Sequence, residues 1–464
     1  MAGSYLLRDE PCGTIGEYVA AGFGDGVRVA RGLGRTGIAE ALAGSGLRAR
    51  DHTAVDLSVK WAEFARGGDD LGDRYLVVNA TDAEPGSFSD RALIRSNPFA
   101  VVEGVVACAI ATGVCEAFVA LRGSFHAEYD VMVRALAEAE LAGWLESVSV
   151  KCVRTPDAHL VGDDRALLEC IEGRPPVPRR GPPELDGLFR DRPGGVDRSA
   201  GGAPPGSRRS NPTLVETPET LATVAAIVAN GGRWFRSLGT ALSPGSLLCT
   251  VTGDVVHPRV AEVELGTTLR TAVETVGEGF RGSPRGVLNG VSSPVMGRSR
   301  LAAPLSWEGL GQVGANVGRA AFVVLGDDAD MVAVASQVSS YLHVESCALC
   351  PACKFGGGEV AAHLQRLAAG AGSARDVELM HRRLATIDDD ARCGLALRHR
   401  DVVTSLLRAF PGDVLDPPER PRDGRVYVGD LVELDVLGAR YDETRVFKRA
   451  DWSYADTPVL LARR

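Results

Sequence analysis

The run Tyr75-Leu-Val-Val-Asn79 opens the pattern that decides the fold. Five residues that are mostly apolar and end in a polar loop are typical of a short strand buried on both faces. A long apolar helix is expected after Asn97-Pro98, over 101–111, and a second buried strand at Ala117-Phe-Val-Ala-Leu121. This alternation of strand and helix predicts a mostly parallel α/β sheet.

The alternation continues to the middle of the chain. A helix is expected over 126–142, a strand over 148–153 and a short helix over 165–171. Residues 174–212 are rich in Pro, Gly and Arg, a composition that cannot fill a core, so we expect a surface loop there. A helix over 217–229 follows. We therefore assign residues 1–240 to one Rossmann-like α/β domain that contains the 174–212 loop.

Two further domains and a tail are expected beyond residue 240. Strands over 248–253 and 261–265, a helix over 268–276 and a strand over 321–325 predict a small β-grasp domain at 241–328. Residues 329–415 have helical patterns and predict a C-terminal bundle, with helices over 332–344, 358–369, 374–387 and 398–410. Residues 416–464 form a polar tail with one strand-like run, 426–428.

Four cysteines of the predicted bundle indicate a metal centre. Three lie in Glu345-Ser-Cys-Ala-Leu-Cys-Pro-Ala-Cys-Lys354, at Cys347, Cys350 and Cys353, and the fourth is Cys393. A C-x2-C-x2-C run with one distant cysteine is the spacing that holds a [4Fe-4S] cubane, a centre for electron transfer. Structural zinc, which also takes four thiolates, is the alternative. Unligated structural thiols and strained disulfides between such close cysteines are the remaining ones.

Composition excludes several other classes of protein. The chain has 464 residues, of which 45% are hydrophobic, and its formal net charge of −9 argues against general nucleic-acid binding. No start signal and no apolar run of about 18 residues is present, so neither secretion nor direct insertion into a membrane is expected. The other six cysteines lie mostly in apolar surroundings and suit a reducing compartment. We expect a cytoplasmic protein, free or at the periphery of a membrane complex.

Several motifs, in order, resemble the NADH-binding flavoprotein (51 kDa, or F) subunit of respiratory complex I and related soluble hydrogenases and formate dehydrogenases. Residues 345–353 are similar to that family's E-S-C-G-x-C-x-P-C, and residues 75–91 to Y-L-V-V-N-A-D-E-S-E-P-G-T-F-K-D-R. Residues 97–104, 161–173 and 234–239 match three more family motifs. The resemblance implies an FMN domain, a ubiquitin-like (SLBB) domain and a helical bundle whose four cysteines hold one [4Fe-4S] cluster. It also places Lys60, Asn79, Glu84, Asp163 and Asp164 at FMN and NADH positions.

The sequence departs from the family where FMN would bind. The family's glycine-rich loop, G-R-G-G-A-G-F-P-T-G-x-K-W, lets backbone amides approach the flavin phosphate. Residues 49–61 retain only its Arg50, Lys60 and Trp61, while Asp51 places a carboxylate where the phosphate is expected and Val55 replaces an aromatic residue. The family's V-N-N-V-E-T-L, here 215–221, has lost its asparagine pair, and Thr81 replaces the first acid of the N-A-D-E-S-E motif.

Three functions follow from this pattern. The first is an iron–sulfur electron-transfer protein that has lost or altered FMN and NADH binding and serves a redox partner, either ferredoxin-like or another oxidoreductase subunit. The second is an FMN-dependent NADH dehydrogenase subunit, in which flavin accepts a hydride and passes single electrons to the cluster. The third is a structural subunit whose cluster only stabilises the bundle. The sequence leaves open whether the chain is itself an enzyme.

Overall fold

The computed structural model describes residues 4–8, 10–66, 73–189, 211–415, 425–435 and 438–442. These residues form two compact units. Unit 1 contains the residues up to Thr81 and Ser89–Leu247, and unit 2 contains Asp82–Phe88 and the chain from Leu248 onward. Part of the predicted 174–212 loop (190–210) and most of the predicted 416–464 tail lie outside the described residues.

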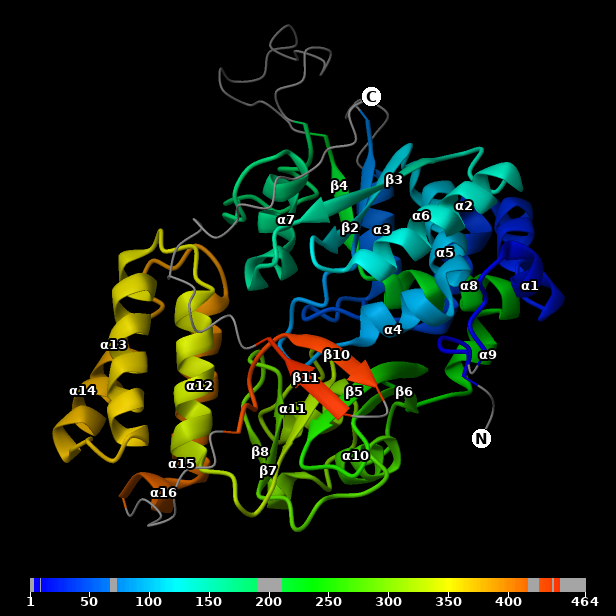
Figure 1. Ribbon diagram of the computed structural model, residues 1–464. Helices are drawn as coiled ribbons and strands as arrows, with labels where there is room; N and C mark the ends of the chain where they lie inside the picture. The colour runs from blue at the N-terminus through cyan, green and yellow to red at the C-terminus, as the bar shows by residue number, and fades with distance from the viewer. Residues whose placement is uncertain are drawn as a thin grey trace, which may run out of the picture. The chain divides into compact units, whose positions relative to one another are not determined.

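Unit 1 is built on a parallel sheet with the strand order β3-β2-β1-β4 (Figure 1). The strands are β1 (Tyr75–Asn79), β2 (Glu116–Arg122), β3 (Ser149–Thr155) and β4 (Thr213–Glu216). All five residues of β1 and all four of β4 are buried, as expected for a parallel sheet covered on both faces. The predicted parallel α/β sheet is therefore confirmed, and β4 is a strand that the sequence pattern did not predict.

The helices of unit 1 follow the predicted alternation. They are α1 (Ile15–Ala20), α2 (Asp25–Ser45), α3 (Leu57–Arg66), α4 (Ser89–Ser96), α5 (Pro98–Thr112), α6 (His126–Leu141), α7 (Asp164–Ile171), α8 (Pro218–Asn230) and α9 (Gly232–Arg236). Pro98 and Pro218 each occupy the first turn of a helix, where the missing N–H costs no hydrogen bond. The apolar α5 packs against α8 and α2 and forms the centre of this core.

Unit 2 contains a five-stranded sheet with the order β6-β5-β9-β7-β8. Its elements are β5 (Ser246–Gly253), β6 (Arg259–Glu264), α10 (Leu269–Val276), β7 (Gly286–Asn289), β8 (Met296–Gly297), the 3₁₀ helix η4 (Arg298–Arg300), α11 (Trp307–Gln312) and β9 (Ala321–Leu325). Strand β5 pairs in parallel with β9, and β7 pairs antiparallel with both β8 and β9. The predicted strand–strand–helix–strand order is present, with β7 and β8 added.

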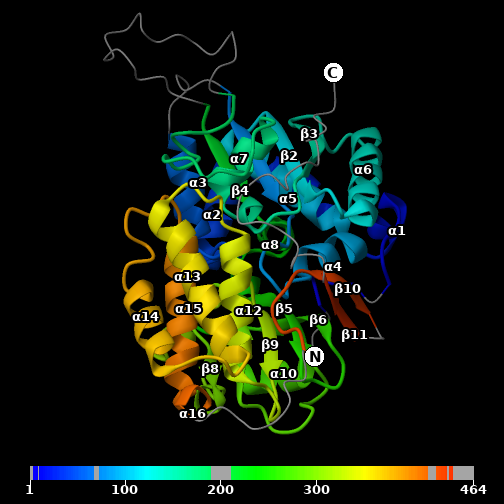
Figure 2. The ribbon, with the colours of Figure 1, turned by 60° about the vertical axis from the view of Figure 1, so that its left-hand side comes forward.

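Helices follow the sheet of unit 2 and pack beside one another (Figures 1 and 2). They are α12 (Met331–Val344), α13 (Pro351–Ala368), α14 (Ala374–Leu384), α15 (Leu395–Ala409) and the short α16 (Pro411–Leu415). Helix α12 contacts α13 and α15, and α13 contacts α14. An ion pair of 2.6 Å between Arg285 and Asp413 joins the sheet to α16.

The end of the described chain forms a hairpin of β10 (Leu431–Asp435) and β11 (Gly438–Tyr441). The strand-like run at 426–428 is not a strand, so that prediction was wrong. The N–H groups of Tyr427 and Val428 instead donate to the side-chain oxygen of Gln337, which takes them out of any ladder. No single helix among the described residues has the length and apolar content of a membrane span. Helices α4 and α5 have that length and apolar content only when taken together, and the chain bends by 99° between them.

Candidate functional site

The three clustered cysteines lie where α12 passes into α13. Cys347 is buried in the connection, Cys350 is the N-cap residue of α13, and Cys353 lies in the first turn of that helix. The sequence predicts helices over 332–344 and 358–369, which would leave all three cysteines in a loop. The helix begins earlier because Pro351 occupies its first position, where proline favours helix initiation.

The fourth cysteine comes to the other three from the connection before α15. Burial, with added charge repulsion from Cys393, Cys347 and Cys350, raises the pKa of Cys353 to about 12. The Sγ atom of Cys350 accepts the backbone N–H of Arg392 at 3.3 Å. Thiols that influence one another's ionisation lie close together, so the fold gathers all four in one region. Metal binding to such thiols releases their protons.

The surroundings of the thiols also fit a bound cluster. Ser346, next to Cys347, is buried, and its hydroxyl has no hydrogen-bond partner among the described residues. A buried hydroxyl without a partner is costly, and hydrogen bonds to cluster sulfurs are one way in which proteins tune such centres. Ala348 has a φ of 58°, in the left-handed region, at the position where the family motif has glycine.

A site for a single metal ion has different geometric requirements from a site for a cluster. Within the described ranges, no group of three or more His, Cys, Asp or Glu side chains is placed to hold one metal ion. Structural zinc needs four ligands around one ion, with sulfurs at about 2.3 Å. A cubane distributes its four thiolates over different irons.

A second cluster of functional groups lies in unit 1 and is made of charged side chains. Lys60 of α3 donates its Nζ to the carbonyl oxygen of Val215 at 2.7 Å and lies 3.0 Å from Oε1 of Glu216. The indole N–H of Trp61 donates to the same Oε1 at 2.9 Å. The Lys60 side chain is 13% exposed and that of Glu216 is 0% exposed. Both residues that this chain shares with the family's Lys-Trp pair thus bind a carboxylate of the chain itself.

Burial and neighbouring charges shift the pKa values in this cluster. Burial raises the pKa of Glu216, although Lys60 opposes the shift. Burial also raises the pKa of Asp164 to about 8, with Lys60 opposing and the carboxylates of Asp51, Asp163 and Glu216 adding to it. Burial disfavours charge on Lys60 too, yet Glu216, Asp51 and Asp164 hold its pKa above the usual range. The cluster therefore has more acidic groups than its single lysine can balance.

The loop that replaces the family's glycine-rich segment is closed by its own side chain. The Oδ1 atom of Asp51 accepts the backbone N–H of Thr53 at 2.7 Å, the Thr53 hydroxyl at 2.6 Å and the N–H of Ala54 at 3.0 Å. These are backbone N–H groups that an anion would otherwise engage in such a loop. Val55, the residue in place of the family's aromatic, is 46% exposed.

The remaining predicted site residues have clear structural partners. The Asn79 side chain ends β1, donating to the Val161 carbonyl at 3.4 Å and accepting the Thr81 hydroxyl at 2.7 Å. Asp163 caps α7 by accepting the N–H groups of Arg165 and Ala166.

Glu84 belongs to unit 2, where its carboxylate accepts the N–H of Val291. Glu216 is the residue that sequence reasoning missed as a partner of Lys60. Its position in the sequence was the available signal, since Glu216 replaces the first asparagine of the family's V-N-N-V-E-T-L motif and follows Leu214 and Val215.

Comparison with known proteins finds a family region for each of the two clusters. Residues 42–225 match the model of the Nuo51 FMN-binding domain, and residues 333–416 match the NADH-ubiquinone oxidoreductase-F iron-sulfur binding region. The second match contains all four cysteines and confirms the predicted iron–sulfur region.

Among similar proteins is the F 2 subunit of NADH-quinone oxidoreductase from Rhizobium meliloti (strain 1021), 30% identical over 77% of this chain and 83% of that protein. NADH dehydrogenase [ubiquinone] flavoprotein 1 of Dictyostelium discoideum is 28% identical over 82% of this chain and 79% of that protein. An NAD+-reducing [NiFe]-hydrogenase structure in the H2-reduced state matches with a TM-score of 0.70 and 28% identity. That match covers 82% of this chain, which spans 63% of the length of the hydrogenase chain.

Proposed function

The chain belongs to the family of NADH-quinone oxidoreductase F subunits. Within this family, we propose that it is an iron–sulfur electron-transfer protein whose flavin site no longer binds FMN. Four cysteines would hold the [4Fe-4S] cluster: Cys347, Cys350, Cys353 and Cys393. The chain would serve as a one-electron relay for another redox protein.

The contact between Lys60 and Glu216 carries the proposal. A flavin phosphate is an anion that needs a free cation and free N–H donors. Here Lys60 is engaged by a buried carboxylate and a carbonyl oxygen, and Asp51 occupies N–H groups of its own loop. Adding a phosphate beside Asp51 and Glu216 would add negative charge to a site that already has more acidic groups than cations. The residues present therefore do not fit FMN.

The cysteine region, by contrast, fits its cofactor. When bound, a [4Fe-4S] cluster exchanges one electron at a time with a partner. The protein's part is to supply four thiolates, the Arg392 N–H to Cys350 and the buried Ser346 hydroxyl. Hydrogen bonds of this kind to ligating sulfurs raise the reduction potential of a cluster by stabilising its more negative state.

Exposed apolar side chains beside the ligands support a protein partner. Leu349, between two of the cysteines, is 48% exposed, and Phe355, two residues after the third, is 63% exposed. Lys354 lies between Cys353 and Phe355. Exposed apolar side chains with a lysine beside them suit a redox protein with an acidic surface. We propose either a ferredoxin-like protein or another oxidoreductase subunit in this role.

The domain assignments are part of the same proposal. The strand order of unit 2, with two antiparallel neighbours and a parallel central pair, supports assigning 241–328 to the SLBB-like β-grasp domain. Helices α12 to α15 support assigning 329–415 to the cluster-binding bundle, with 1–240 as the FMN-domain-like part and 416–464 as a tail. We propose a cytoplasmic protein that can attach peripherally to a membrane complex.

An FMN-dependent NADH dehydrogenase subunit is the second candidate. It is favoured by the match of residues 42–225 to the FMN-binding domain. In that case Lys60, Asn79, Glu84, Asp163 and Asp164 would contribute to a rearranged flavin and nicotinamide site.

Addition of NADH to the anaerobically purified, oxidised protein separates the two candidates. A nicotinamide hydride carries two electrons, so without a flavin NADH cannot reduce a one-electron cluster directly. We expect no change in the visible iron–sulfur absorption with NADH and full bleaching with dithionite. Bleaching by NADH within the time of an enzymatic turnover would establish the second candidate and refute the first.

A further inference from the structure

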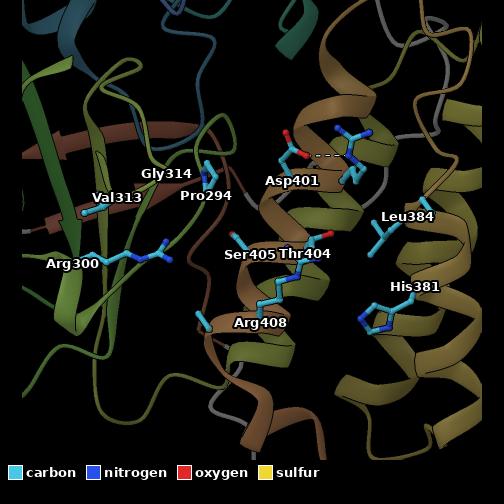
Figure 3. Close-up of a pocket in the computed structure, with 13 residues that line it drawn as sticks. Pro294, Arg300, Val313, Gly314, His381, Leu384, Asp401, Thr404, Ser405 and Arg408 are labelled. Carbon is cyan, nitrogen blue, oxygen red and sulfur yellow. Dashed lines mark hydrogen bonds and ion pairs between the residues drawn. The ribbon is translucent and has the colours of Figure 1, made fainter. Parts of the chain in front are cut away.

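A cavity of about 580 Å³ lies along α15 in unit 2 and has no part in the proposed electron transfer. Residues 294–314 form one wall and α14 the other (Figure 3). Its volume falls within the range of ordinary small-molecule sites, about 300–1,000 Å³. The ion pair of Arg285 with Asp413 and the bond from the Val295 N–H to Ser405 fix the first wall to the helices.

Two arginines of this cavity have no acidic partner. Arg300, at the end of η4, extends toward α15, and Arg408 lies in the last turn of α15 (Figure 3). In the part of the chain that the structure describes, neither guanidinium has a hydrogen bond or an ion pair. Arg400 differs, because Asp388 at 2.6 Å and Asp401 at 3.0 Å neutralise it. The cavity thus has an excess of positive charge.

Polar and apolar groups complete the lining. The Thr404 hydroxyl, on the same helix as Arg408, has no hydrogen-bond partner within the described ranges. His381 of α14 bonds through Nδ1 to the carbonyl oxygen of Val377 at 2.8 Å, which leaves Nε2 for a ligand. Leu384 and Val313 add apolar surface on opposite walls.

We propose that this cavity binds a small molecule that carries a phosphate group and an apolar portion. Guanidiniums are the preferred partners of a phosphate, because their planar N–H groups match its oxygens. Arg300 and Arg408 bind the phosphate, Thr404 and His381 contribute hydrogen bonds, and Leu384 and Val313 contact the apolar portion. The proposal uses no cluster ligand and no residue of the flavin region, so it stands whichever function proves correct.

Titration calorimetry on the cluster-containing full chain tests the site, with inorganic phosphate and phenyl phosphate as probes. We expect phenyl phosphate to bind more tightly than inorganic phosphate, and both to weaken as salt is raised. Arg300→Gln and Arg408→Gln should each weaken binding of phenyl phosphate about tenfold or more, the loss expected for one charge-assisted hydrogen bond. Thr404→Val should weaken it less, without changing the charge of the cavity.

Arg382→Gln is the matched control. Arg382 lies next to His381 but outside the cavity, is 68% exposed and pairs with Glu378, so the variant removes the same charge from the same region. It should leave the affinity within about twofold. Absence of binding by the wild-type chain would overturn the proposal, as would an equal loss in Arg382→Gln. Binding of poly-glutamate but not of phenyl phosphate would also overturn it, because the surface would then recognise an acidic polypeptide.

Discussion

Replacing Lys60 by methionine tests whether this lysine neutralises the buried carboxylate of Glu216. The substitution keeps the length of the side chain and removes the charge 3.0 Å from Oε1 of Glu216, whose side chain is fully buried. Breaking a buried ion pair from one side costs about 3–5 kcal/mol. We expect about 3 kcal/mol, at the low end, because the Trp61 N–H still donates to the same oxygen.

The double variant Lys60→Met/Glu216→Gln removes both charges and should recover most of that loss, to within about 1 kcal/mol of the wild-type free energy of unfolding. Lys151→Met is the matched control, since Lys151 forms a 2.6 Å pair with Glu116 but is 51% exposed. An exposed pair of this kind contributes about 0–1 kcal/mol.

Urea unfolding of the anaerobically purified full chain, followed by far-ultraviolet circular dichroism, measures these differences. With a slope of about 3 kcal/mol per molar urea, a loss of about 3 kcal/mol moves the midpoint of unit 1 by about 1 M. The reasoning is refuted if Lys60→Met costs no more than Lys151→Met. It is also refuted if the double variant is as unstable as the sum of its single variants.

Three further perturbations have defined outcomes. Asp163→Ala removes the cap that accepts two N–H groups at the start of α7 and should lower stability by about 1 kcal/mol in the same urea assay. Asp164 has a pKa of about 8 in the folded protein against 3.8 when unfolded, so it holds a proton only in the folded state between these values and its contribution is lost as pH rises from about 4 to 8. The stability of Asp164→Asn relative to wild type should therefore increase over that pH range, and a difference independent of pH would contradict the assignment. Cys393→Ser should lower the bound iron and the visible absorption, whereas Cys170→Ser, at a buried cysteine of α7, should leave both unchanged.

Much of the fold could be predicted because its central elements have strong local patterns. The apolar run 75–79 and the Asn97-Pro98 start of α5 carry enough information by themselves. Strands β7 and β8 are four and two residues long, too short for a periodic pattern. The strand-like run 426–428 was mispredicted because it makes its hydrogen bonds to a side chain instead of a neighbouring strand.

The two functional clusters also differ in whether their residues are close together in the sequence. The cysteine spacing is local, so the sequence predicts a metal centre without knowledge of the fold. The partner of Trp61 and Lys60 is distant, because Glu216 lies 155 residues further along the chain from Trp61. Only the parallel pairing of Tyr75 with Thr213 places β4 beside β1 and ends it near α3. The missing glycines of 49–61 were visible in the sequence, but the carboxylate that engages Lys60 was not.

The cofactor content of the anaerobically purified protein tests the central claim most directly. Flavin released by acid is measured by fluorescence, and iron and acid-labile sulfide are counted on the same sample. The account predicts about four irons and about four sulfides per chain, as in one [4Fe-4S] cluster, with no flavin above background. Flavin at about one equivalent per chain, or zinc in place of iron, would contradict it.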